Sequence, residues 1–258
     1  MTISGRNEYN SGGGLHRPPA MNETANATRQ RLTGRHKWAF ALMPRSTVVL
    51  DIGASASPLS WVLHEKAECM VALDVDGPAL LQLKAADAFA LPVEASSSAL
   101  PIRTDSVDTV LFLDVLEHVR EEEATINEIH RVLKPGGSLI LSVPNKGLFR
   151  FLDPQNLRLR LDGKLDNTSM HRHYSYHQLM GFLGPRFEVV RRHYGGLFLS
   201  PLMFALDNSV RKHWHRDWGR YFRWVSDFDN NISWGTLSYN MIILARQLKR
   251  PDHDQLSK

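Results

Sequence analysis

The sequence predicts a Rossmann-like α/β fold, in which a mostly parallel, seven-stranded sheet is covered by helices on both faces. Short β-branched or apolar runs alternate with segments of helical periodicity, which is typical of parallel sheets. The first of these runs ends in a turn of small residues, Gly53–Ser57, where a ligand can approach the backbone. Hydrophobic residues make up 43% of the 258 residues, so the chain can bury a sizeable core.

The chain divides into five parts. In order, these are a disordered tail (1–20), a helical segment (21–46), a cofactor-binding core (47–146), a C-terminal half that completes the sheet and adds substrate-facing insertions (147–250), and a polar tail (251–258). The first helix is expected from Glu23 to Met43, because Pro44 prevents its continuation.

The expected strands are short apolar runs bounded by turns. They are Thr47–Ile52, Cys69–Leu73, Leu91–Ala95, Thr109–Leu113, Ser138–Val143, Phe187–Arg191 and Leu237–Arg246. The expected helices between them are Pro58–Lys66, Pro78–Ala88, Glu121–Leu133 and Ser175–Leu183, the last with Ser175 as its cap. Lys134–Gly137 is expected to end the third of these helices and turn the chain into the next strand.

The turn after the first strand is a candidate nucleotide site. Ser57 suits a helix N-cap and Pro58 the first helical position, and open α/β sheets bind ligands at this edge. The next strand ends at Asp74, whose carboxylate could accept hydrogen bonds from two ribose hydroxyls. A tight structural turn, with Asp74 as a helix cap, is the alternative.

Two other nucleotide-binding classes fit this turn less well. A nicotinamide dehydrogenase would have a third glycine in the turn, and it would not explain Asp51 at the strand end. A P-loop would need a Gly-Lys-Ser/Thr sequence, which does not follow.

From Thr47 to Asn145 the sequence resembles the class I S-adenosylmethionine-dependent methyltransferases, in particular the group with the ubiquinone and menaquinone C-methyltransferases. The matching pieces are Val49–Gly53, Ala72–Asp74, Ala99–Ile102, Asp105–Val110, Val115–Val119, Arg131–Gly137 and Leu141–Asn145. The resemblance implies the class I methyltransferase fold and S-adenosyl-L-methionine as the cofactor.

The resemblance also implies the residues that bind the cofactor. Asp51 and Gly53 would lie against its methionine part, with Asp51 near the amino end. Asp74 would hold the ribose hydroxyls, and the backbone near Val75 would flank the adenine. The remaining predicted contacts are Ala54 and Ser55 in the turn, Ser96 and Ser97 before the Leu100-Pro101 segment, and Leu113 and Asp114 facing the sulfonium.

Two serine pairs depart from the family pattern. Ser96 and Ser97 stand where the family often has an acidic residue that recognises the adenine amino group, so adenine contact would rely on backbone groups. Ser55 and Ser57 stand where glycine or another small residue is usual, which could alter cofactor affinity or pose.

An oxygen acceptor with a high pKa needs a general base, and the candidates are Asp114, His118 and His173. His118 has a structural role as its alternative. His171 and His173 could share one face of an extended segment as a base, a substrate contact or a metal site, or could lie in a plain surface loop. Carboxylate partners for a metal are not evident, so no metal is predicted.

More than forty residues separate the last two expected strands, and they contain four of the six tryptophans. Apolar residues 196–206 and the basic, aromatic stretch 211–224 resemble an interfacial surface that contacts an anionic membrane and reaches a lipid-linked acceptor. A cap packed on the core is the alternative, and nucleic-acid binding is less favoured because no RNA-binding module accompanies the stretch.

The composition favours a cytoplasmic protein, with peripheral membrane contact through that surface. Cys69 is the only cysteine, and neither a signal peptide nor an apolar run long enough to span a bilayer is evident. A net charge of +4 permits anionic partners without requiring them.

The function predicted is methyl transfer to a small-molecule, glycan or lipid-linked acceptor, with oxygen preferred over carbon or nitrogen. The alternatives are a non-catalytic protein that binds S-adenosylmethionine or S-adenosylhomocysteine, and a C- or N-methyltransferase of a quinone-like or RNA substrate.

Overall fold

The computed structural model describes residues 32, 34–54, 57–86, 89–147, 153, 156, 159–160, 172–197 and 219–248. Both predicted tails, 1–20 and 251–258, lie outside these residues, as does much of the predicted membrane surface. The described residues contain no helix of sufficient length and apolarity to cross a membrane.

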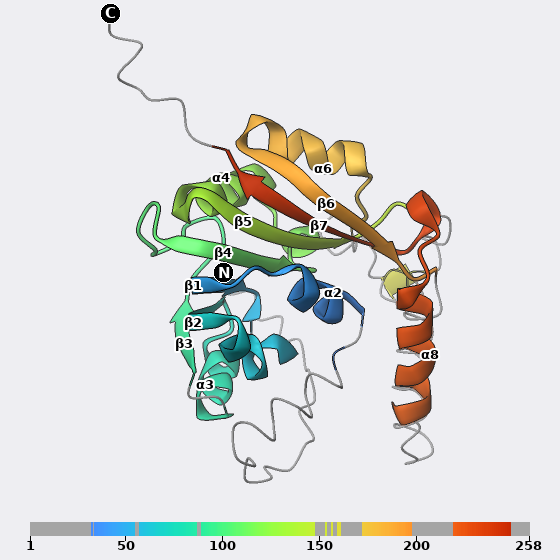
Figure 1. Cartoon of the computed structure of the whole chain (residues 1–258), viewed down its shortest axis with the longest axis horizontal. Coiled ribbons are helices and arrows are strands. Elements are labelled where there is room, and N and C mark those ends of the chain that lie inside the picture. Colours follow the sequence, from blue (N-terminus) through green and yellow to red (C-terminus); the bar gives the residue numbers. More distant parts are fainter. Residues whose placement is uncertain are drawn as a thin grey trace, which may run out of the picture.

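Seven strands form one sheet in the order β3-β2-β1-β4-β5-β7-β6 (Figure 1). They are β1 (Ser46–Ile52), β2 (Ala67–Asp74), β3 (Ala90–Glu94), β4 (Val107–Leu113), β5 (Leu133–Pro144), β6 (Phe187–Gly195) and β7 (Asn240–Gln247). The first five are parallel, and β7 runs antiparallel to both of its neighbours. The predicted mostly parallel seven-stranded sheet is therefore confirmed.

Helices cover both faces of the sheet, as the sequence predicts. Those described are α2 (Gly34–Leu42), α3 (Gly77–Ala86), α4 (Glu122–Val132), α6 (Tyr176–Leu183) and α8 (Gly219–Asn231). Figure 1 shows α4 and α6 on one side of the sheet and α2 and α3 on the other. Ser175 caps α6, and Gln178 completes a capping box with it.

Alternation along the strands gives each face its own core. On β1, Leu50 packs in the cluster with α4 and α6, whereas its neighbour Val49 packs in the cluster with α2 and α3. The same alternation separates Ile140 from Leu139 on β5. Because both faces are buried, these strands read as continuous apolar runs instead of alternating ones.

Three predicted elements differ from the structure. The helix expected from Glu23 to Met43 is described only as α2, from Gly34 to Leu42; Leu32 is not helical, and residues 23–31 and 33 lie outside the described residues. Pro58–Lys66 forms two 3-10 turns, η2 (Pro58–Trp61) and η3 (Leu63–Glu65), instead of one α-helix. This connection is too short to gain much from helix propagation, and its i to i+3 turns bury Leu59 and Val62 directly. The predicted turn Lys134–Gly137 lies inside β5, where the pairing with β4 shifts register and Gly136 has a φ of 78°.

Candidate active site

The carboxyl ends of β1, β2 and β4 meet at one edge of the sheet. Asp51 on β1 pairs with Ala72 on β2 and with Leu111 on β4, so the residues just beyond these positions lie side by side. The chain leaves β1 towards β2 and β3 and then crosses back to β4 on the other side of β1. This reversal creates the crevice in which open α/β sheets bind ligands.

Asp51 is a buried carboxyl group at the centre of this edge. It is 2% exposed, and its Oδ2 atom makes no hydrogen bond to a described residue. Burial raises the pKa of Asp51 to about 7, a hydrogen bond from Ser57 opposes the rise, and the charge of Asp74 adds to it. A buried oxygen without a partner fits a site in which a ligand donor, most favourably a cation, completes the bonding.

The turn after Asp51 requires glycine at position 53. Gly53 has a φ of 80°, and its N–H donates to the carbonyl of Leu73 over 2.8 Å. A Cβ atom there would lie 2.4 Å from Cγ2 of Val115. Ala54 follows and is buried, whereas the predicted contact Ser55 lies outside the described residues. Ser57 is the N-cap of η2, as expected, and its hydroxyl accepts from the N–H of Leu59.

Asp74 stands at the end of β2, next to the turn. Its Oδ1 accepts a hydrogen bond from the N–H of Asp76 over 3.1 Å. The first turn of α3 is capped by Asp76 instead, whose Oδ1 accepts from the N–H of Ala79 over 3.0 Å. Asp74 therefore does not have the helix-capping role that was the alternative to ribose binding. Val75, predicted beside the adenine, is 72% exposed at this edge.

The two serines predicted near the adenine belong to a loop after β3 that bonds to itself and to α4. The hydroxyls of Ser96 and Ser98 lie 3.0 Å apart, and those of Ser97 and Thr125 lie 3.3 Å apart. Side-chain hydroxyl groups therefore link this loop to itself and to α4.

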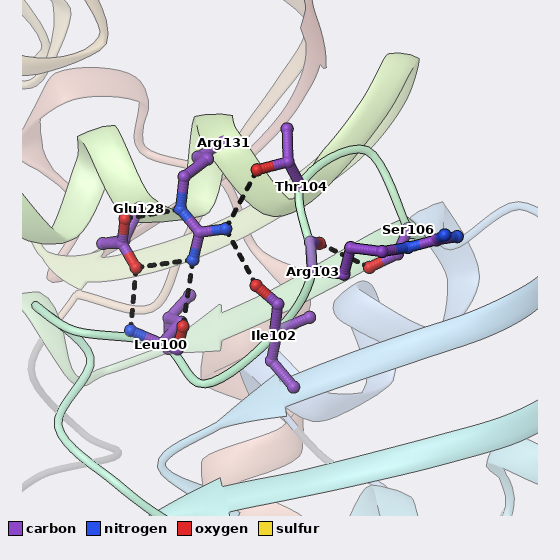
Figure 2. Close-up of polar contacts among 7 residues, drawn as sticks. All are labelled: Leu100, Ile102, Arg103, Thr104, Ser106, Glu128 and Arg131. Carbon is purple, nitrogen blue, oxygen red and sulfur yellow. Dashed lines mark hydrogen bonds and ion pairs between the residues drawn. The ribbon is translucent and has the colours of Figure 1, made fainter.

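Arg131 on α4 holds the segment that follows this loop (Figure 2). Its guanidinium binds both carboxylate oxygens of Glu128 at 2.7 and 2.8 Å, and it donates to the carbonyls of Leu100 and Ile102 at 2.9 and 2.8 Å. Glu128 in turn accepts the N–H of Leu100 over 2.8 Å. This Arg131 clamp ties the loop at the cofactor edge to the covering helix.

Asp114 follows β4 and faces the same edge. Its φ of 53° is in the left-handed region, and its N–H donates to the carbonyl of Ser142 over 3.0 Å. The hydroxyl of Ser142 donates to Oδ1 over 2.5 Å, and Arg35 on α2 contacts Oδ2 at 3.0 Å. Leu113, the preceding residue, is half-buried. Helix α2 therefore brings a cation onto the predicted methyl-transfer side of the site.

The two candidate histidines lie in different surroundings. His118 ends the short turn η4 (Leu116–His118) and is exposed. His173 has a side chain only 6% exposed, with Nδ1 3.1 Å from the carbonyl of Asn145 and Nε2 3.0 Å from the carboxylate of Asp153. Tyr239 donates to the same carboxylate over 2.6 Å.

This bonding favours a structural role for His173. Both ring nitrogens lie within hydrogen-bond distance of oxygen atoms of the chain itself, at Asn145 and Asp153. His171 lies outside the described residues. Within the described part of the chain, no three histidine, cysteine or acidic side chains gather into a group that could hold a metal ion.

Four residues that contact the candidate site residues were not predicted from the sequence: Arg35, Ser142, Asp153 and Tyr239. Arg35 and Asp114 belong to elements that are far apart in the chain, and no local pattern indicates that they pair. Ser142 lies within an apolar strand, and its position next to Asp114 follows only from the register between β4 and β5.

The comparisons with known proteins agree with this architecture. Residues 50–141 match the family model described as a methyltransferase domain. A Mycobacterium tuberculosis protein named as a probable S-adenosylmethionine-dependent methyltransferase is 29% identical over 118 residues, which are 45% of this chain and 43% of that protein. A ubiquinone biosynthesis O-methyltransferase of Pseudomonas aeruginosa is 30% identical over 106 residues, 38% of this chain and 44% of that protein.

A solved structure shows the same fold over a greater length. The SAM-dependent methyltransferase of Methanosarcina mazei superposes with a TM-score of 0.52 at 16% identity and covers 82% of this chain and 97% of that one. The fold is therefore the Rossmann-like class I methyltransferase fold. The family-model match is confined to residues 50–141, and the chain's match to the curated relatives spans only about two fifths of their length.

Proposed function

We propose that the chain is an S-adenosylmethionine-dependent methyltransferase that acts on a small-molecule, glycan or lipid-linked acceptor. The observation that carries the proposal is Asp51 at the crevice between β1 and β4, a buried carboxyl group with one oxygen that no described residue hydrogen-bonds. The methyltransferase-domain match around it and the names of the relatives support the same cofactor.

The residues present fit this cofactor. Asp51 would accept from its amino group, the turn at Gly53 would pass close to its methionine part, and Asp74 would accept from the ribose hydroxyls. The exposed Val75 would offer an apolar surface to the adenine. When bound, the cofactor supplies an electrophilic methyl group.

The acceptor would bind beside Asp114 and Leu113, on the side of the crevice that α2 covers. We prefer oxygen over carbon or nitrogen as the acceptor atom, and the named O-methyltransferase relative supports this preference. Of the predicted bases, Asp114 is the one that defines this position, and Arg35 and Ser142 bind its carboxylate. Arg35 and Ser142 would orient the Asp114 carboxylate. The exposed His118 stays a candidate base.

Calorimetry with S-adenosylmethionine and S-adenosylhomocysteine tests the cofactor. Asp74→Asn should weaken binding by at least about tenfold, since it removes an acceptor of charge-assisted hydrogen bonds. Glu68→Gln is the matched control, because Glu68 is an exposed acid at the opposite end of the same strand. If neither compound binds the wild-type protein, the proposal is wrong. If Asp74→Asn binds as tightly as Glu68→Gln, the ribose assignment is wrong.

Transfer itself is tested by mass spectrometry of cell extracts incubated with the protein and cofactor labelled in the methyl group. A labelled product that requires the protein would identify the acceptor and the atom methylated. Binding without any labelled product would favour the non-catalytic alternative.

We also propose that the protein contacts anionic membranes through α8 and the residues that follow it. Trp224 and Phe228 on α8 are 66% and 57% exposed, and their rings stack with centroids 6.2 Å apart. Trp234 and Leu237 add two more large apolar side chains that are about half exposed. Aromatic side chains presented in this way suit the interface of a bilayer.

Co-sedimentation with anionic liposomes at low and high salt tests this contact. The wild-type protein should pellet at low salt, and a Trp224→Ala/Phe228→Ala variant should pellet severalfold less. Val190→Ala is the control, because Val190 is an exposed apolar residue on the edge strand β6. No pelleting of the wild-type protein, or equal pelleting of the double variant and the control, would contradict the proposal.

A further inference from the structure

His36 lies on the face of α2 that packs against the sheet. Residues three and four positions apart share one face of an α-helix. Ala39 and Phe40, three and four positions beyond His36, are both buried in the core cluster on this side of the sheet. His36 itself is half-buried. The inner face of α2 therefore carries two apolar side chains and, one turn earlier, an imidazole ring.

The direction of α2 places this ring at the carboxyl edge of the sheet. Near the end of the helix, the carbonyl of Phe40 accepts from Nζ of Lys66 over 2.6 Å, and Lys66 directly precedes β2. Near the start of the helix, Arg35 contacts Oδ2 of Asp114, which follows β4, at 3.0 Å. The first turn of α2 thus lies where the strands end, and His36 is part of that turn.

Asp51 points to the side of the sheet that α2 covers. Side chains two positions apart on a strand share one face, and Val49 packs in the same core cluster as Ala39 and Phe40. The charge of Asp114 acts on the ring of His36, which agrees with a position close to the end of β4. His36 therefore lies over the crevice between the ends of β1 and β4, on the same side as the carboxyl group of Asp51.

The ring of His36 is neutral and accessible to a ligand. No described residue hydrogen-bonds it, and neither of its nitrogens is fully buried. Burial and then the charge of Arg35 lower the pKa of His36 to about 3, against an opposing effect of Asp114. One ring nitrogen of a neutral imidazole carries a lone pair that can accept a hydrogen bond. The carboxylate of Asp114 differs, because Ser142 and Arg35 already bind both of its oxygens.

We propose that His36 is the catalytic base of the methyl transfer and accepts the proton of an acceptor hydroxyl group next to Asp114. The proposal rests on the proposed function and deepens it, because it names a hydroxyl-bearing acceptor and the group that takes its proton. A lone pair of the hydroxyl oxygen forms the bond to the methyl carbon, and the bond from that carbon to sulfur breaks with its electron pair left on sulfur. The hydroxyl proton moves to His36, which passes it to solvent after the product leaves.

A weakly basic ring suits this step. The hydroxyl oxygen gains positive charge as its bond to the methyl carbon forms, so its proton becomes far more acidic than in the free acceptor, and a weak base can then take it. The ring stays in its basic form above about pH 4, so no proton has to leave it before the reaction. A neutral ring also does not repel the sulfonium cation of the cofactor.

Nuclear magnetic resonance of the full chain, with ¹⁵N in the histidine rings, tests the position of His36. The signals are assigned with His36→Gln, and the probe is S-adenosylhomocysteine. We expect a neutral His36 ring at pH 6 and a saturable shift of its signals with the probe. The exposed His177 on α6, on the opposite side of the sheet (Figure 1), should not respond. A charged His36 ring at pH 6, or bound probe without a His36 shift, would overturn the proposal.

The chemical role is tested with cell extract as the source of acceptor and with cofactor labelled in the methyl group. His36→Gln keeps a polar side chain but cannot take a proton. It should form labelled product at least about a hundredfold more slowly than the wild-type protein, with an affinity for S-adenosylhomocysteine that changes less than about twofold. His177→Gln is the matched control and should leave both unchanged. The label should be found on oxygen, and a label on nitrogen or carbon would overturn the proposal.

The same measurements separate this proposal from the proposed function. Equal rates for His36→Gln and His177→Gln overturn the role of His36 alone. Loss of S-adenosylhomocysteine binding in His36→Gln also overturns it, because the ring would then serve the cofactor site or the fold. A wild-type protein that does not bind S-adenosylhomocysteine, or binds it and forms no labelled product, overturns the proposed function, and the role of His36 is lost with it.

Discussion

The protonation state of Asp51 should depend on whether the proposed cofactor is bound. Its pKa is raised to about 7 by burial, so in the protein without ligand the group is largely protonated below neutral pH. An ammonium group beside it favours the carboxylate and lowers this pKa. Cofactor binding and proton release should therefore be coupled at the very residue on which the proposed function depends.

We predict that binding of S-adenosylhomocysteine at pH 6 releases close to one proton from Asp51. A group with a pKa near 7 is about 0.9 protonated at pH 6, and the bound ammonium removes that proton; at pH 9 the group is already ionised, so no release is expected from it. The measurement is calorimetry in buffers of different ionisation enthalpy at both pH values. Asp51→Asn should abolish the release at pH 6. If the variant releases as many protons as the wild-type protein, Asp51 does not contact the ammonium.

At the scale of single elements, the sequence predicted those strands and helix starts that depend on a local pattern of residues. Apolar runs bounded by turns located all seven strands to within a few residues, and Ser175 marked the start of α6. The pattern did not distinguish an α-helix from two 3-10 turns at Pro58–Lys66. Packing decides that choice, because Leu59 and Val62 are both fully buried in the cluster that also contains residues of α2.

The Arg131 clamp is an element-scale device, because it fixes the loop at the cofactor edge through one side chain of α4. Arg131→Met should lower the free energy of unfolding by about 2–3 kcal/mol, since it removes the cation that binds Glu128 and the donor to the carbonyls of Leu100 and Ile102. Urea unfolding followed by circular dichroism measures this. Arg103→Met is the control, because Arg103 is exposed on the same segment (Figure 2). Equal stability of the two variants would show that the clamp contributes little.

At the scale of the whole molecule, the site depends on contacts that no stretch of sequence contains. Asp51, Gly53 and Asp74 could be predicted, because strand ends and turns mark them and the parallel sheet brings them together. The Arg35–Asp114 pair and the stacked Trp38 and His193 rings could not, since they join α2 to β4 and β6 across most of the chain. The proposed cofactor side of the site is thus local in sequence, whereas the surroundings of Asp114 are assembled by tertiary packing.

This difference leads to a prediction about how ligand binding stabilises the molecule. S-adenosylhomocysteine at a hundred times its Kd should raise the free energy of unfolding by about 2.7 kcal/mol, which corresponds to a rise in Tm of about 5–10 °C. Added protection from hydrogen exchange should concentrate at the backbone amides of Gly53, Asp76 and Asp114, at the carboxyl ends of their strands. The amides of β6 should change least, because that strand lies at the far edge of the sheet.

Differential scanning calorimetry and exchange mass spectrometry measure the two effects on the full-length chain. Asp74→Asn should reduce the rise in Tm, whereas Glu68→Gln should leave it unchanged. A rise in Tm accompanied by uniform protection across the sheet would mean that the ligand stabilises the fold without binding at this edge. Protection confined to α8 and β6 would place the binding site elsewhere. Protection at the three turns alone would place the cofactor at the reversal between β1 and β4, from which the acceptor side can then be mapped.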